Sequence, residues 1–459
     1  MHRRGQRNWI FIALAMVAIF VVAFLIKQSM DEKDGGNLDS DGGGNFVVAK
    51  AEYPELAPYP NHEEGYDEKA QAEWEESQKQ LQVEGDDYGK DYQEFLETYL
   101  MQIADQNFEE GKNGVMSPLS IYLASSMLAE TTANNTQAQI LELLKTDTIE
   151  EVRENAKNLW LSNYQDDGQY TSVLANSIWL REGADFNQDT LKNITDNYYA
   201  SMFSGDTSDP AYSQELRDWI NENTGNLLEE EAEEIKLKPE TLMAIISTVY
   251  FNANWMDEFL DENTEDKEFF ALDSKVTVPF MQEKNLEGDY LEAEKYTASS
   301  KLLKSYGKMW FILPNEGEDV QEILKDHSIY QVPKNNHDVT VKTVNLSLPK
   351  FDVTYDVSLI DSLKSLGFTD MFDASVSDFS PLGDFEDLAV DEFTHAARIK
   401  VDEKGVEAAA FTVIAIAETS APMPTDEVDF VLDRPFIFML TNKDGLVTFV
   451  GVVNNPEEK

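Results

Sequence analysis

The chain has 459 residues, of which 42% are hydrophobic and 11% aromatic, enough to bury a core in one large domain or two ordinary ones. Acidic residues outnumber basic residues by 87 to 36, and the formal net charge is −51. This charge disfavours nucleic acid and sulfated polysaccharide as partners, because basic surfaces bind both. No cysteine is present, so the chain forms no disulfide and offers no thiolate as nucleophile or metal ligand.

The first predicted element is the uncharged apolar run 9–26, which is just long enough to span a bilayer. Arg3, Arg4 and Arg7 precede it, so the positive-inside rule places residues 1–8 in the cytoplasm as a short tip and the remainder outside the cell. No small-residue cleavage site follows the run. We therefore expect an uncleaved transmembrane anchor at the cell membrane, with secretion after signal-peptide cleavage as the alternative.

Residues 27–91 are predicted to form an acidic flexible linker, because glycine and aspartate dominate its beginning. Three prolines within 54–60 argue against any regular element before Asn61. A Glu- and Gln-rich piece around 72–82 favours a short helix.

A folded domain is predicted over residues 92–459. Amphipathic spacing predicts a helix over 92–103, and Ser117 as N-cap before Pro118 predicts the start of another. Further helices are expected over 189–201 and 212–223, and strands over 172–180, 241–251, 308–313, 342–348, 436–441 and 446–453. Helices early and strands late predict an α+β fold.

The segment 403–420 alternates along an extended chain and continues into a proline-containing loop. One side of it carries the small or apolar residues Val406, Ala408, Ala410, Thr412, Ile414 and Ile416. An edge strand followed by a turn is the plainer interpretation. The alternative is a segment that is exposed in one state and lies inside a sheet in another.

Several segments resemble the serpin family, in the expected order, over residues 92–456. They are SPLSI at 117–121, WINENTG at 219–225, YFNANW at 250–255, LPKF at 348–351, LGFTDMF at 366–372, His395, EKGVEAAA at 403–410, RPFIF at 434–438 and GVVNNP at 451–456. The resemblance implies a serpin fold, with about nine helices around three β-sheets and an exposed reactive-centre loop. Here a transmembrane helix and an acidic linker would precede that fold, which is typical of a bacterial member that is either membrane-tethered or secreted.

The function that the resemblance implies is inhibition of a protease by a change of fold. A target protease cleaves the loop at Thr419–Ser420, and the freed loop inserts into the main sheet before the acyl bond is hydrolysed. The protease is distorted and stays covalently attached. The hinge where insertion starts comprises Glu403, Gly405, Val406, Glu407, Ala408, Ala409, Ala410 and Thr412. Small side chains on its inward face should pass readily between parted strands, and Phe411 points away from that face.

Two further clusters follow from the resemblance. The shutter, a hydrogen-bonded cluster below the parting strands, comprises Ser117, Ser120, Ser247 and His395. The family usually has asparagine at the position of Ser247, which has a shorter reach. Trp255 and Lys350 match the breach, where the strands first part, and Lys350 is expected to pair with Glu403. No catalytic role is expected for any of them.

Thr419 would enter the main specificity pocket of the target. Its short β-branched side chain suits an elastase-like or subtilisin-like serine protease and argues against a trypsin-like one. A cut shifted by one residue would place Glu418 or Ser420 in that pocket, and a cysteine protease is an alternative target. We expect a monomer that needs no cofactor or metal.

Two other functions compete with inhibition. One is a non-inhibitory serpin that serves as a binding or chaperone-like module; bulky, charged or proline residues on the inward hinge face would favour it, and none occurs between Val406 and Thr412. The other is an enzyme. It is disfavoured because only five histidines are present and neither G-x-S-x-G nor H-E-x-x-H occurs.

Overall fold

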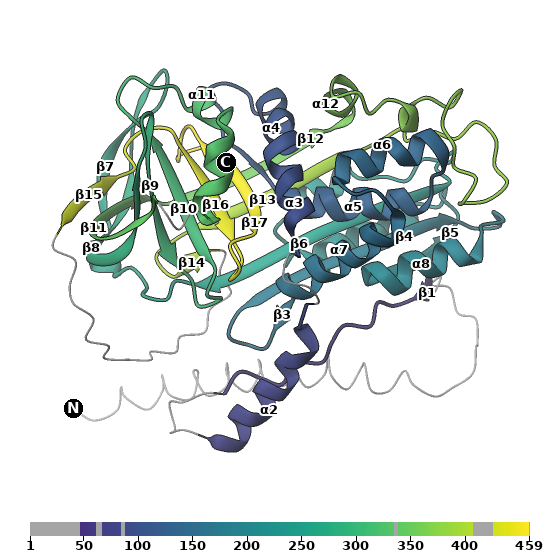
Figure 1. Cartoon of the computed structure of the whole chain (residues 1–459), viewed down its shortest axis with the longest axis horizontal. Helices are drawn as coiled ribbons and strands as arrows, with labels where there is room; N and C mark the ends of the chain where they lie inside the picture. The colour runs from purple at the N-terminus through teal and green to yellow at the C-terminus, as the bar shows by residue number, and fades with distance from the viewer. Residues whose placement is uncertain (1–45, 61–66, 84–87, 335–337, 407–425, 459) are drawn as a thin grey trace, which may run out of the picture. The chain divides into compact units, whose positions relative to one another are not determined.

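In the part of the chain that the structure describes, a central sheet of eight strands organises the fold (Figure 1). In hydrogen-bonding order its strands are β1 (Val47–Ala49), β5 (Ala200–Gly205), β4 (Thr171–Arg181), β6 (Met243–Asn254), β14 (Gly405–Val406), β13 (Thr394–Val401) and β12 (Phe351–Ser358), with β3 (Gln165–Asp166) paired to β4. β4 and β5 are parallel, and the other ladders of this sheet are antiparallel.

The computed structural model describes residues 46–60, 67–83, 88–334, 338–406 and 426–458. Within these ranges, no helix combines the length and hydrophobicity that crossing a bilayer requires. The predicted anchor, residues 9–26, lies outside the described residues.

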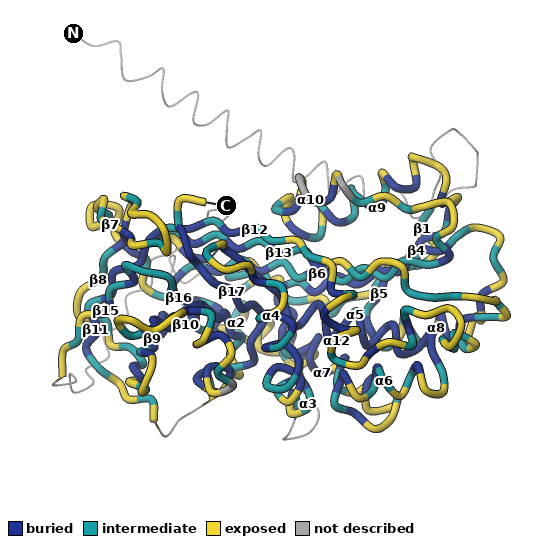
Figure 2. The backbone as a smooth tube through the Cα atoms, turned by 90° about the horizontal axis from the view of Figure 1, so that it is seen from above, coloured by how far each residue is buried: buried dark blue, intermediate teal, exposed yellow. Residues whose placement is uncertain are grey.

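Helices cover both faces of the central sheet, because its strands carry apolar side chains on both faces. One face is covered by α5 (Pro118–Glu130), α6 (Asn134–Leu144), α7 (Ile149–Asn163) and α8 (Gln188–Tyr198), and the other by α9 (Pro210–Asn223) and α10 (Glu229–Glu234), as Figure 2 shows. Along β4, Leu174 and Ile178 belong to the core under the first group of helices. Trp179 belongs to the core under α9, where its ring stacks on Phe203.

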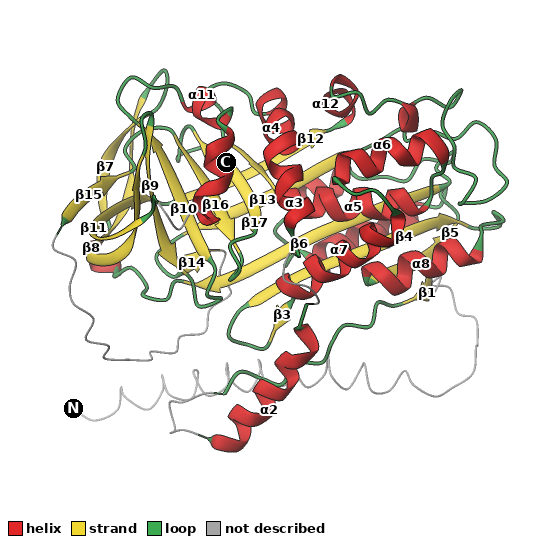
Figure 3. Cartoon of the chain, viewed as in Figure 1, coloured by secondary structure: helices red, strands yellow, loops and turns green. Residues whose placement is uncertain are grey.

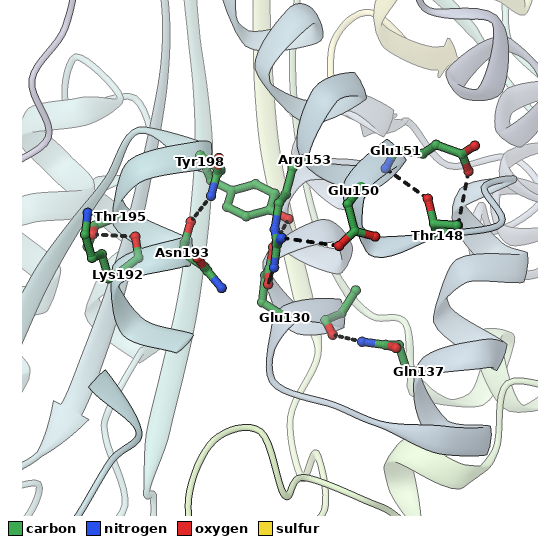
Figure 4. Close-up of polar contacts among 12 residues, drawn as sticks. Glu130, Gln137, Thr148, Glu150, Glu151, Arg153, Lys192, Asn193, Thr195 and Tyr198 are labelled. Atoms are coloured by element: carbon green, nitrogen blue, oxygen red, sulfur yellow. Dashed lines mark hydrogen bonds and ion pairs between the residues drawn. The ribbon is translucent and has the colours of Figure 1, made fainter. Parts of the chain in front are cut away.

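A buried ion pair joins three of these helices (Figure 4). Glu130, the last residue of α5, accepts hydrogen bonds of 2.6 and 2.8 Å from Arg153 of α7. It also accepts a bond of 2.8 Å from the hydroxyl of Tyr198, the last residue of α8. The side chain of Glu130 is 3% exposed, so these three donors replace the water that its charge would otherwise hold. Burial and the neighbouring Glu130 raise the pKa of Tyr198, which therefore keeps the proton that it donates.

The remaining strands form a second sheet of nine strands (Figure 3). In order they are β15 (Glu427–Val431), β11 (Thr340–Pro349), β8 (Lys275–Glu292), β9 (Tyr296–Leu302), β10 (Lys308–Pro314), β16 (Phe436–Thr441), β17 (Val447–Val453) and β2 (Gly114–Met116), with β7 (Glu265–Phe270) paired to β8. β8 pairs with β7 at its start, with β11 along its middle and with β9 at its end. The described ladders therefore form two continuous sheets where the resemblance implied three.

The remaining helical segments are short. They are α2 (Glu68–Gln78), η1 (Lys79–Leu81), α3 (Lys90–Phe95), η2 (Leu96–Leu100), α4 (Met101–Asn107), η3 (Asp261–Asn263), α11 (Val320–Leu324), η4 (His327–Lys334), α12 (Ile360–Ser365) and η5 (Asp370–Phe372). The helices and strands predicted for the folded domain are present, with shifted ends. The helix expected over 189–201 ends at Tyr198, because Tyr199 takes a left-handed conformation and β5 begins at Ala200. Ser117 caps α5 by accepting a bond of 3.3 Å from the Ser120 amide.

The chain from 46 to 60 departs from the linker prediction. The expectation that no regular element precedes Asn61 is wrong, because β1 pairs with the edge strand β5. Phe46 adds a ring contact to Tyr212 of α9, with 4.9 Å between ring centroids. β1 thus covers a sheet edge that would otherwise present unpaired backbone groups.

Candidate functional site

The central sheet is split along its middle, between β6 and β13. No ladder joins these two strands directly in the part of the chain that the structure describes. β14 lies between them at one end, where Val406 pairs with Ala253 of β6 and with Val401 of β13. β6 is only partly buried along most of its length despite its central place (Figure 2). Two facing strand edges form a template for one more strand.

Gly405 is the point where the chain enters the split. A Cβ at this position would lie 2.3 Å from the carbonyl oxygen of Ala253 and 2.7 Å from the Cα of Asn254. Both neighbours are backbone atoms, which cannot swing aside as a side chain can. Only glycine therefore lets β14 approach β6 this closely.

The three residues before Gly405 are held by Trp255 of the predicted breach and by Phe259. The backbone amide of Trp255 donates to the carbonyl of Lys404 at 2.8 Å, and its indole Nε1 donates to that of Asp402 at 2.9 Å. The amide of Phe259 donates to the carbonyl of Glu403 at 2.9 Å. Two aromatic residues thus fix three consecutive carbonyl groups at the entrance of the split.

The side chain of Glu403 is anchored on the same side. Lys350 Nζ lies 2.6 Å from Glu403 Oε1, which is the pairing that the resemblance implies. Thr264 donates a hydrogen bond of 2.8 Å to the same carboxylate. Burial opposes ionisation of Glu403, but the bonds from Lys350, from its own backbone and from Thr264 outweigh it, and its pKa lies below the ordinary value.

Ser117, Ser120 and His395 meet in the predicted shutter. His395 Nε2 accepts a hydrogen bond of 3.0 Å from the Ser117 amide, and its Nδ1 lies 3.5 Å from Ser120 Oγ. An accepting Nε2 requires a ring that is protonated at Nδ1 only. Burial lowers the pKa of His395 to about 4, so the ring is neutral at physiological pH. The imidazole therefore serves as a fixed hydrogen-bonding unit.

Ser247 stands beside this cluster without bonding to it. Its hydroxyl is buried and has no hydrogen-bond partner among the residues that the structure describes. It borders a cavity of about 30 Å³ whose walls include Ser117, Ser120, Thr224, Leu227, Leu228, Ala396, Ala397 and Arg398. The walls come from the start of α5, from β6, β13 and β17 and from the segment after α9, so the cavity lies beside the split between β6 and β13. A space of this size has room for one water molecule.

The other predicted site residues fall on a part of the chain that is not described. They are Glu407, Ala408, Ala409, Ala410, Thr412, Thr419 and Ser420, and their roles stay predictions. Sequence reasoning missed Phe259 and Thr264, whose contacts with Glu403 arise from an irregular segment and leave no periodic pattern. Among the described residues, no group of three or more His, Asp or Glu side chains is arranged to hold a metal ion.

These features define an α+β protein whose main sheet is open to a further strand, with Gly405 at the entrance of the split. A family model described as serpin (serine protease inhibitor) matches residues 91–456, and the chain belongs to the serpin family.

The chain is similar to serpins from distant organisms. It is 28% identical to neuroserpin of Homo sapiens over 370 residues, which cover 76% of this chain and 87% of that protein. It is 27% identical to the leukocyte elastase inhibitor of Equus caballus over 361 residues, which cover 75% of this chain and 93% of that protein. The native state of the thermophilic serpin tengpin superposes with a TM-score of 0.70 and 28% identity, covering 82% of this chain and 96% of that one.

Thyroxine-binding globulin in complex with thyroxine shares the fold, with a TM-score of 0.68, 22% identity and coverage of 80% of this chain and 100% of that one. A protein named for binding a small molecule thus has the same architecture. The fold by itself does not decide between inhibition and binding.

Proposed function

We propose that this serpin inhibits an extracellular serine protease by acting as a suicide substrate. The observation that carries the proposal is the split between β6 and β13, with Gly405 and Val406 already seated at its entrance. A strand that continued from Val406 would meet two unpaired edges. The family description, serine protease inhibitor, supports the same class of activity.

The register of β14 supports insertion of the loop that follows it. Val406 lies opposite Ala253, so the same register along β6 would bring residue 416 opposite Met243, the first residue of that strand. Along the way Thr412 would lie opposite Ser247. Since Val406 also lies opposite Val401, the register along β13 would bring Thr412 opposite His395. Opposed residues of an antiparallel ladder share a face, so the Thr412 hydroxyl would enter the shutter.

Insertion of the loop would be favourable by several contributions. Each new ladder hydrogen bond stabilises the sheet by ~0.5–1.5 kcal/mol net. Burial of Ile414 and Ile416 would contribute about 1.5–3 kcal/mol each. The intact loop is tethered at both of its ends, so these gains become available when the protease cuts it.

The trapping chemistry belongs to the protease. Its serine oxygen attacks the carbonyl carbon of Thr419, the peptide bond to Ser420 breaks, and the new amine takes the proton relayed by the protease histidine. An ester then joins Thr419 to the protease. Hydrolysis of this ester needs the oxyanion hole and the general base in position. Insertion of the loop pulls on the ester and distorts that arrangement, so the covalent complex persists.

The target and the location are part of the proposal. The small side chain of Thr419 supports an elastase-like or subtilisin-like target. The apolar run 9–26 supports anchorage in the cell membrane with the serpin domain outside, and release after signal cleavage is the alternative. We propose a monomer, because one chain supplies the loop, the hinge and the sheet.

Incubation of the purified full-length chain with pancreatic elastase and with subtilisin tests the function. The expected result on a denaturing gel is a covalent band at the summed mass of inhibitor and protease. Thr412→Arg is the control, because a charged side chain should block insertion and turn the inhibitor into a substrate. Thr419→Arg should transfer the covalent band to trypsin.

A non-inhibitory binding module predicts a different result. Both proteases would then cleave the loop without a covalent band, and the cleaved chain would melt at the temperature of the intact chain. An inhibitory serpin should instead melt at a higher temperature after cleavage, because the inserted strand adds ladder bonds and buried area. This pair of measurements separates the two functions.

A further inference from the structure

A lysine is buried directly behind the breach. Lys301 of β9 is 2% exposed as a residue and 1% exposed in its side chain. Its ammonium forms an ion pair with Glu283 of β8. Asp257 is a second acidic group close enough to act on it. Burial lowers the pKa of Lys301, and the carboxylates of Glu283 and Asp257 oppose this shift.

The same ammonium lies against the aromatic rings of Phe259 and Trp255. Lys301 Nζ is 4.5 Å from the ring centroid of Phe259 and 5.7 Å from that of Trp255. The two rings contact each other edge to face, with 6.1 Å between their centroids. A cation over a ring face is attracted by the ring quadrupole, most strongly where water is excluded.

These rings belong to the residues that hold the hinge. Trp255 and Phe259 bind the carbonyl groups of Asp402, Glu403 and Lys404 through three hydrogen bonds of 2.8–2.9 Å. Phe259 lies in an irregular segment between β6 and η3, where no ladder fixes its position. Its place therefore depends on its bond to Glu403 and on the contacts of its ring.

We propose that Lys301 is a positioning residue for the hinge: its buried ammonium, held by Glu283, fixes Phe259 and Trp255 so that their donors stay aimed at residues 402–404. Its contribution to inhibition rests on the proposed function, because it concerns the rate at which the hinge opens. The position of the rings is a property of the uncleaved chain. It is measurable without any protease.

Hydrogen exchange on the full chain measures the hinge directly. In Lys301→Met, which removes the charge and keeps a long apolar side chain, the amides of Trp255 and Phe259 should exchange about three- to thirtyfold faster than in the wild type. That range corresponds to the loss of one cation–π contact. Exchange in β4 serves as the internal reference for global changes.

Lys308→Met is the control for removal of a paired lysine at a more exposed position, since its side chain is 39% exposed against 1% for Lys301. Lys308 also pairs with a carboxylate, Asp289 at 2.6 Å, and lies over an indole ring, that of Trp310 at 5.8 Å. Asp289 bonds to Ser299, Ser300 and Lys308 rather than to residues 402–404, so exchange at Trp255 and Phe259 should stay within about twofold of the wild type. A second variant, Glu283→Gln, removes the charge that holds the ammonium and should accelerate hinge exchange in the same direction as Lys301→Met. If Lys301→Met does not fold, Glu283→Gln provides the test in its place.

A double-mutant cycle with Phe259→Leu separates positioning from a general loss of stability. Since Phe259 has the nearer ring, at 4.5 Å from the ammonium against 5.7 Å for Trp255, the two substitutions should accelerate exchange at Trp255 by less than the product of their separate effects. Additive effects, unchanged hinge exchange in Lys301→Met, or an equal effect in Lys308→Met would overturn the proposal. Failure of the wild type to trap a protease would refute the proposed function and leave the exchange result to decide the role of Lys301.

Discussion

Lys350 Nζ lies 2.6 Å from Glu403 Oε1, and this ion pair anchors the chain immediately before it enters the split sheet. The two side chains are unequally covered, with 36% of Lys350 and 12% of Glu403 exposed. Water therefore stabilises the charge of Glu403 less than that of Lys350, and the carboxylate relies more on the ion pair. The ion pair holds the side chain of Glu403. The hydrogen bonds from Trp255 and Phe259 hold the backbone carbonyl groups of residues 402–404.

Removal of the Lys350 charge should loosen the hinge. In Lys350→Met the carboxylate of Glu403 keeps only its neutral donors, so we expect a loss of about 1 kcal/mol in the free energy of unfolding. Spontaneous loss of inhibitory activity should also become faster. Urea unfolding and activity half-life measure the two effects. Lys69→Met is the control, since its pair with Glu73 is 84% and 60% exposed and should change stability little. Equal losses in the two variants would contradict a special role for Lys350.

Gly405→Ala should prevent β14 from entering the split. The added methyl group would lie 2.3 Å from the carbonyl oxygen of Ala253, so strand pairing at this point has to break. We expect a covalent band at least tenfold weaker, with most of the chain cleaved as substrate. Gly288→Ala is the control, because its Cβ would meet nothing closer than the Ser300 carbonyl oxygen at 3.5 Å. Unchanged trapping by Gly405→Ala would contradict the assigned entrance.

Ser247→Asn should stabilise the uncleaved state. Its longer amide can fill part of the cavity of about 30 Å³ and reach the polar groups of the shutter that the hydroxyl does not reach. We expect a gain of about 1 kcal/mol in the free energy of unfolding and slower insertion of the loop. Ser247→Ala removes an unpaired hydroxyl and should change stability by less than about 0.5 kcal/mol. Thermal unfolding of both variants measures these changes. A lower melting temperature for Ser247→Asn than for the wild type would count against the cavity argument.

The stability of the protein should fall in acid because of His395. Its pKa is about 4 in the folded chain against an ordinary value of 6.5, so the unfolded chain takes up the proton first as the pH falls. The contribution of neutral His395 to the free energy of unfolding is complete above pH 6.5. It is lost progressively toward pH 4, by up to roughly 3 kcal/mol. Urea unfolding of wild type and His395→Gln across this range isolates the contribution, because carboxylates titrate in both. Parallel stability curves would show that His395 is not its source.

Arg153→Met should be severely destabilising, because it leaves the Glu130 carboxylate buried with the Tyr198 hydroxyl as a neutral donor (Figure 4). We expect a loss of about 3–5 kcal/mol in the free energy of unfolding. Adding Glu130→Gln to the variant should restore part of this loss, since the second change removes the uncompensated charge. Lys192→Met is the control, because its partner Asp196 is 53% exposed. Denaturant unfolding of the wild type and the three variants gives the comparison, and no recovery in the double variant would argue against charge burial as the cause.

Local sequence signals predicted the elements that depend on near neighbours. Ser117 and Pro118 marked the start of α5, and apolar runs marked the long strands of both sheets. The resemblance also placed Glu403 beside Lys350, a contact between distant segments. Contacts that depend on distant partners and match no recognised motif were missed. β1 becomes a strand because β5 offers it an edge, and Lys301 lies against the rings of Trp255 and Phe259 because β9 ends next to Trp255.

The sequence by itself determined the family and the order of most helices and strands, and it predicted which residues form the hinge. These features are encoded in side-chain periodicity, caps and short motifs, which act over a few residues. Only the tertiary structure decided that the sheet is split at β6 and β13, that Ser247 borders a cavity without a partner, and that a buried ammonium lies behind the breach. Burial and pairing of this kind arise from groups far apart in the chain, and no local pattern records which of them will meet.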